Sequence, residues 1–109
     1  MKFNAEKGED EINSDFIEID KPNIVLDALK LSEDGSKDLI IRVHENLGMF
    51  TKFELKLNIL EHYSKWIHSA ILVNILEEQE SESQVSITST SISFTLEAFK
   101  FQTFRVKIE

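Results

Sequence analysis

The chain has 109 residues and no cysteine, and its 20 acidic and 12 basic residues give a formal charge of −8 at pH 7. This length predicts one domain whose hydrophobic core is large enough to be stable without disulfides or bound metal ions. The lack of cysteine excludes disulfides and thiolate metal sites. The acidic balance argues against nucleic acid or an anionic membrane surface as a partner, because both are bound through Lys and Arg.

The first 15 residues are mostly polar and charged, and we interpret them as a flexible leader or the remnant of a linker. They lack the apolar segment of a signal peptide. No run in the chain reaches the roughly 18 apolar residues of a membrane span. Residues 16–109 are therefore expected to form the folded domain.

A β-hairpin is predicted next, from the runs Ile24–Leu31 and Leu39–Glu45 and the polar link that contains Asp34-Gly35. Glycine there can adopt the positive φ of a tight turn. A short strand within Phe16–Asp20 precedes the hairpin and ends before Pro22, which donates no ladder hydrogen bond. Both faces of the first hairpin strand carry apolar residues, so this strand is expected in the interior of a sheet.

Strict alternation over Thr51–Ile59 predicts a strand with one face in the core, including Leu55 and Leu57, and one face in water. The following stretch, Leu60–His68, is interpreted as a loop with Trp66 tucked into the edge of the fold. The helical spacing of its apolar residues also fits one short helical turn.

The apolar run Ser69–Glu78 predicts a strand buried on both faces, followed by a polar turn at Gln79–Gln84. Alternation resumes at Val85–Thr88 and Ile92–Ala98, where Ser and Thr fill one face.

In the last run, Phe99–Ile108, the apolar phase changes between Phe101 and Phe104, which predicts a bulge or a switch of sheet. The whole pattern has seven or eight strands, no long helix and no strand–helix alternation. It predicts an all-β fold, an antiparallel β-sandwich that is immunoglobulin-like in general architecture.

Four segments also carry a family resemblance: Lys30-Leu-Ser-Glu-Asp-Gly35, Leu39-Ile-Ile-Arg-Val-His-Glu-Asn-Leu-Gly48, Asn74-Ile-Leu-Glu77 and Phe99-Lys-Phe-Gln-Thr-Phe-Arg-Val106. In this order and spacing they resemble the last domain of class II α-mannosidases, glycoside hydrolase family 38, and are most similar to the cytosolic and vacuolar type. The resemblance covers roughly residues 16–109. His44 stands where the family usually carries tyrosine.

The resemblance implies a β-sandwich without a catalytic set of its own. The parent activity it implies is retaining, metal-assisted hydrolysis of α-mannosidic bonds in oligosaccharides. A divalent metal, expected to be zinc, would then belong to the parent's catalytic domain, and this chain would hold no cofactor. The expected partners are the other domains of the parent or a second copy of the chain, in the cytoplasm or in a vacuole or lysosome.

The residues themselves suggest no catalytic or metal site. His44, His62 and His68 match no zinc-ligand spacing. The acidic pairs Glu33/Asp34 and Glu77/Glu78 are interpreted as solvated or capping charge, not as the two carboxyl groups of a glycosidase.

Arg42, Glu45, Phe50 and Trp66 are the candidates for docking onto neighbouring domains. Glu45 shares its strand parity with inward-facing Val43, so its carboxylate must find hydrogen-bond partners near the core. Arg42 points the other way. The alternative to docking by Arg42 or Glu45 is a local salt bridge, to Lys30 or to Asp27 across the hairpin.

Phe50 and Trp66 lie in segments that alternation does not bury, as do Leu47, Met49 and Ile67. If the chain is a terminal domain, these residues are expected to form a bare apolar patch. Tyr63 and Trp66 leave a second class open, a free-standing carbohydrate- or protein-binding module with an aromatic sugar platform. Packing in a core or an interface is the simpler interpretation of both rings.

Overall fold

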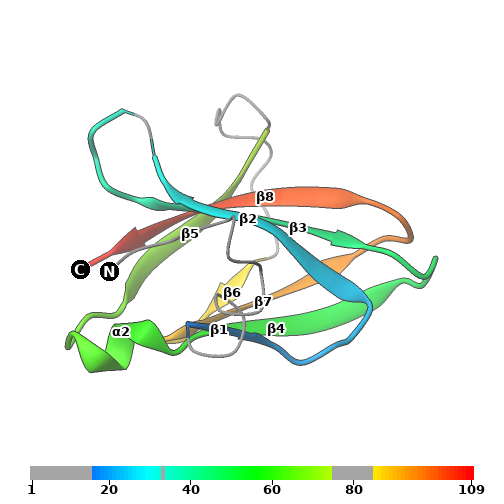
Figure 1. Cartoon of the computed structure of the whole chain (residues 1–109), viewed down its shortest axis with the longest axis horizontal. Coiled ribbons are helices and arrows are strands. Elements are labelled where there is room, and N and C mark those ends of the chain that lie inside the picture. The colour runs from blue at the N-terminus through cyan, green and yellow to red at the C-terminus, as the bar shows by residue number, and fades with distance from the viewer. Residues whose placement is uncertain (1–15, 33, 75–84) are drawn as a thin grey trace.

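Two four-stranded antiparallel sheets lie face to face in the computed structural model (Figure 1). The structure describes residues 16–32, 34–74 and 85–109. The arrangement confirms the predicted antiparallel β-sandwich. The predicted leader, the turn at Gln79–Gln84 and the pair Glu77/Glu78 lie outside the described residues.

One sheet has the order β2-β3-β8-β5, formed by Ile24–Leu31, Leu39–Glu45, Phe101–Ile108 and Ile67–Val73. The other has the order β1-β4-β7-β6, formed by Ile17–Ile19, Thr51–Leu57, Ser91–Leu96 and Ser86–Ile87. A short helix, α2 (Ile59–His62), follows β4. Over the ranges described, no helix combines the length and the hydropathy that crossing a membrane requires.

The core lies between the sheets and is filled by the inward residues of both. On β4 the predicted alternation is confirmed: Leu55 and Leu57 are buried, whereas Lys52 and Glu54 are exposed. The strand ends earlier than predicted, because Asn58 already has helical φ and ψ and Ile59 begins α2.

The hairpin of β2 and β3 has the predicted bounds, and Gly35 in its turn has φ +85°. The expected interior position of β2 is wrong, since β2 is an edge strand. Both faces of β2 looked apolar in the sequence because the strand contains a bulge between Leu26 and Ala28. It adds a residue, Asp27, and so brings Leu26 and Leu29 onto the same inner face, where both pack against the core.

The strand predicted at Ser69–Glu78 begins earlier, at Ile67, and is also an edge strand. Leu72 and Val73, whose side chains point to opposite faces, are both buried, whereas Ala70 and Ile71 are only half-buried, so the predicted burial on both faces holds only at the end of the strand. A run of apolar residues is typical of an interior strand, but here Ile71 pairs with Arg105 of β8, on the outer side of the sheet.

The bulge predicted between Phe101 and Phe104 is absent. β8 pairs with β3 in unbroken register from His44↔Phe101 to Leu39↔Val106. The change of apolar phase has another cause: Phe101 points out of the sandwich and stacks on His44, with ring centroids 4.8 Å apart.

The interpretation of Leu60–His68 as a loop is wrong in two respects. Its first residues belong to the helical turn α2, and Trp66 is 53% exposed instead of tucked into the sandwich. The Trp66 backbone exchanges two hydrogen bonds with Glu109, the last residue, and this leaves the indole outside. Ile67, which was expected on the surface, is buried as the first residue of β5.

Candidate docking surface

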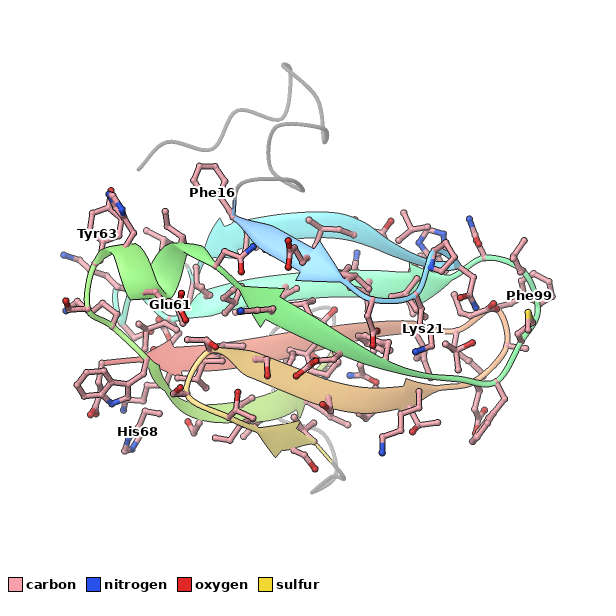
Figure 2. All side chains as sticks on the ribbon, turned by 90° about the horizontal axis from the view of Figure 1, so that it is seen from below. Phe16, Lys21, Glu61, Tyr63, His68 and Phe99 are labelled. Atoms are coloured by element: carbon pink, nitrogen blue, oxygen red, sulfur yellow. The ribbon has the colours of Figure 1, made fainter. Side chains whose placement is uncertain are left out.

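The connections β1–β2, β3–β4 and β7–β8 meet at one end of the sandwich (Figure 1). Figure 2 shows Phe99 of the β7–β8 connection at this end, and Tyr63 and His68 at the opposite end. Glu45, the last residue of β3, lies where the three connections converge.

The Glu45 side chain is 1% exposed and accepts four hydrogen bonds. Oε1 accepts from the backbone N–H of Gly48 at 2.7 Å and of Phe99 at 2.9 Å. Oε2 accepts from the Leu47 N–H at 3.0 Å and from the Asn23 amide at 2.7 Å. Among the described residues, no Lys, Arg or His forms an ion pair with this carboxylate.

The network continues beyond Glu45. Asn23 also donates to the Thr51 hydroxyl at 2.8 Å, and Thr51 donates to the Met49 carbonyl at 2.8 Å. Asn46 N–H donates to the Asn23 carbonyl at 3.0 Å. In the part of the chain that the structure describes, every buried side-chain nitrogen and oxygen has a partner. A buried polar network that is fully paired holds its backbone in one arrangement.

Two opposing effects set the pKa of Glu45. Burial raises it, because a charge loses its hydration. Hydrogen bonds from the Phe99 backbone, the Asn23 side chain and the Leu47 backbone lower it, and they prevail, so that the pKa falls to about 2. Glu45 is therefore an anion at neutral pH.

Five large apolar side chains surround this network and are between 55% and 74% exposed. We call them the apolar end: Leu47, Met49, Phe50, Phe99 and Phe101. A hollow of about 480 Å³ opens beside them and is lined by both Phe50 and Phe101. An exposed apolar cluster next to a hollow is typical of a surface that receives a partner.

The two turns of the apolar end contact each other closely. Phe99 has φ +59° and Gly48 has φ +82°. A Cβ at position 48 would lie 2.8 Å from Cε2 and Cζ of the Phe99 ring. The ring therefore lies directly on the Gly48 backbone, at a position where the positive φ favours glycine and a side chain would displace the ring.

The structure separates the four predicted docking residues. Phe50 belongs to the apolar end, and Glu45 lies beneath it as a buried hydrogen-bond acceptor. Arg42 is on the outer face of the sheet, where its Nε donates to the Thr103 hydroxyl at 3.3 Å. Trp66 directly precedes β5, between Tyr63 and His68, which Figure 2 shows at the end opposite Phe99, so it cannot share one surface with Phe50.

The local salt bridges considered for Arg42 and Glu45 are not formed. The bulge on β2 directs Asp27 toward His44 instead, and the His44 Nδ1 lies 2.8 and 2.9 Å from the two Asp27 oxygens. Phe99 and Phe101 were missed as surface residues because both were assigned to the closing strand. The change of apolar phase at Phe101 was the signal that could have found them.

The histidines lie in separate places. His44 pairs with Asp27, and the His62 ring contacts the Tyr63 ring edge-on. The His68 Nδ1 lies 3.5 Å from the Glu109 Oε1. Within residues 16–32, 34–74 and 85–109, no three His, Cys, Asp or Glu side chains come together as metal ligands.

Comparison with known proteins gives one family. The model for the glycosyl hydrolases family 38 C-terminal beta sandwich domain matches residues 23–104, a range that contains Glu45 and the whole apolar end. No curated protein matches the chain. The sandwich topology and this match lead to one conclusion: the chain belongs to the family 38 C-terminal beta sandwich domains, and is a non-catalytic domain of a glycoside hydrolase family 38 protein.

Proposed function

We propose that the chain is the terminal, non-catalytic domain of an α-mannosidase of the cytosolic or vacuolar type, and that it packs onto a neighbouring domain of that enzyme through the apolar end. The observation that carries the proposal is the set of five exposed apolar side chains on two adjoining turns and the first residue of β8. A family of C-terminal domains has neighbours by definition, and a bare apolar surface is what such a domain presents before it meets one.

The composition of the apolar end favours a docking role. Aromatic residues and Met are enriched in the centres of interfaces, and three Phe and one Met occur here. The hollow between Phe50 and Phe101 offers a place for one apolar side chain of the partner. An isolated copy of the chain, with this surface uncovered, is expected to self-associate weakly.

The mannoside specificity is part of the proposal and comes from the resemblance of the four segments described above. The proposed parent hydrolyses α-mannosidic bonds in oligosaccharides, with a divalent metal in its catalytic domain. The proposed location is the cytoplasm, or a vacuole or lysosome. The role of this chain in that enzyme is structural.

A binding experiment tests the docking role. The partner is the family 38 catalytic region encoded in the same genome, expressed separately, and binding is measured by calorimetry and sedimentation. Phe50→Ser is expected to weaken binding at least about tenfold, because Phe50 is the most exposed side chain of the apolar end. Trp66→Ser removes an exposed aromatic ring from the opposite end and is the matched control. Equal binding by both variants contradicts the proposal.

A second function is supported by Tyr63 and Trp66, which are 52% and 53% exposed at the end away from the apolar end. Exposed aromatic rings can stack on sugars, as a carbohydrate-binding module requires. Trp66 is the only tryptophan, so its fluorescence reports on this place alone. We expect no change on titration with mannobiose. A saturable shift that Trp66→Ala abolishes would favour the binding module.

A further inference from the structure

The buried carboxylate of Glu45 binds the backbone of the residues that form the docking surface. Its backbone donors are Leu47, Gly48 and Phe99. Leu47 and Phe99 carry exposed side chains of the apolar end, and Gly48 lies against the Phe99 ring. One oxygen, Oε1, accepts from both Gly48 and Phe99, and so joins the β3–β4 turn to the β7–β8 turn.

The conformation of Phe99 shows that this end is held in place. A bulky residue rarely adopts φ +59°, and it persists there only where the surroundings determine the backbone. The Phe99 N–H donates to Glu45, and the Phe99 ring rests on Gly48, whose own φ is +82°. Both turns therefore use unusual backbone angles to bring an exposed phenylalanine to one place.

An apolar side chain of similar volume at position 45 would leave the backbone N–H groups of Leu47, Gly48 and Phe99 without their acceptor. A carboxylate without a cationic partner is useful where several N–H groups must be fixed in direction at once, as they are here.

We infer that Glu45 is a positioning residue that forms the docking surface in advance, so that Leu47 and Phe99 already stand in their binding geometry before the partner domain arrives. This inference rests on the proposed function. The partner it fits is an apolar, concave surface on a neighbouring domain of the same family 38 protein. Fixing the two turns beforehand removes the cost of ordering them on binding.

Amide hydrogen exchange of the free chain tests the positioning directly. The amides of Leu47, Gly48 and Phe99 are expected to be protected, because each donates to a buried oxygen. In Glu45→Gln, exchange at these amides is expected to rise at least about tenfold, while the amide of Ile41, in the middle of β3, stays unchanged. Unprotected amides in the wild-type chain, or no rise in the variant, overturn the inference.

Binding to the separately expressed catalytic region gives the second measurement. Glu45→Gln is expected to weaken binding about tenfold at a temperature at which both proteins are fully folded. In a Phe99→Ala background the same substitution is expected to have a smaller effect, because the side chain it positions is gone. A full effect in that background means that Glu45 acts through general stability and overturns the inference.

A milder variant covers the case in which Glu45→Gln does not fold. Asn23→Ala keeps the carboxylate but removes one donor to Oε2, and a smaller rise in exchange at the same three amides is expected. No rise there overturns the inference. The proposed function fails separately, if Phe50→Ser leaves binding intact. If Phe50→Ser abolishes binding while Glu45→Gln changes neither exchange nor binding, only the inference fails.

Discussion

The two ends of the sandwich hold their turns with carboxylates in opposite environments. At the apolar end, Glu45 is buried and accepts four N–H groups, and none of the ion pairs among the described residues involves it. At the opposite end, the turn between β2 and β3 is held by Arg105, whose guanidinium lies 2.7 Å from both Asp34 and Asp38. Only Asp34 is exposed there: its side chain is 55% exposed, whereas those of Asp38 and Arg105 are 13% and 18% exposed.

The difference concerns what each carboxylate can fix. An exposed ion pair is screened by water and holds long side chains loosely. A buried carboxylate that accepts backbone N–H groups fixes the backbone itself, and with it every side chain that the backbone carries. The exposed phenylalanines are found at the end with the buried carboxylate, which is the end proposed to dock.

The largest expected effect is on the free energy of unfolding, from a substitution in the core between the sheets, away from both ends. Leu57→Ala should lower the free energy of unfolding by about 2–5 kcal/mol, because it leaves a cavity where a fully buried side chain stood. Lys56→Ala, on the opposite face of β4, should change it by no more than about 0.5 kcal/mol. Urea denaturation measures both, and equal losses contradict the assignment of the inner face.

The second effect, of intermediate size, separates the two carboxylates by pH. The pKa of Glu45 falls from its ordinary value of 4.5 to about 2 on folding, so its contribution to stability is complete above pH 4.5 and is lost as the pH falls through about 2. The Arg105 guanidinium also lowers the pKa of Asp34, which adds a loss of the same sign.

We expect Glu45→Gln to flatten the decline in the urea midpoint between pH 5 and pH 2 by more than Asp34→Asn does, because water screens the exposed pair. Midpoints measured at each pH unit decide this. A steeper contribution from Asp34 would reverse the comparison of the two ends.

The last prediction is an absence of hydrolytic activity in the isolated chain. The two carboxylates that come together at the β2–β3 turn, Asp34 and Asp38, are both paired with Arg105, so we expect the purified chain to release no mannose from an aryl α-mannoside with any divalent metal. An active α-mannosidase assayed with the same metals is the control. Metal-dependent release that grows with the concentration of the chain would contradict the structural role.

The alternation of apolar and polar residues predicted the strands well where the apolar residues are buried in the core. The alternation around Leu55 and Leu57 placed β4, and the turn at Gly35 placed the hairpin. The parity of Glu45 also predicted a buried carboxylate. Its donors could not be predicted, because they come from three connections that meet only in the folded sandwich.

Periodicity failed where an apolar residue is displayed instead of buried. Phe101 and Trp66 have the hydrophobicity of core residues, and hydrophobicity alone cannot tell an exposed ring from an interior one; only the change of apolar phase at Phe101 marked the difference. The edge position of β2 was hidden by the bulge at Asp27, which reverses the phase of the strand and made both of its faces look apolar.

That bulge has a consequence for how the chain can associate. β2 is an eight-residue edge strand, and a long flat edge is a template onto which further chains can add without limit and grow into fibres. The extra residue twists the edge, and the charged side chains of Asp27 and Lys30 stand exposed along it. Both features disfavour the addition of a further strand at this edge.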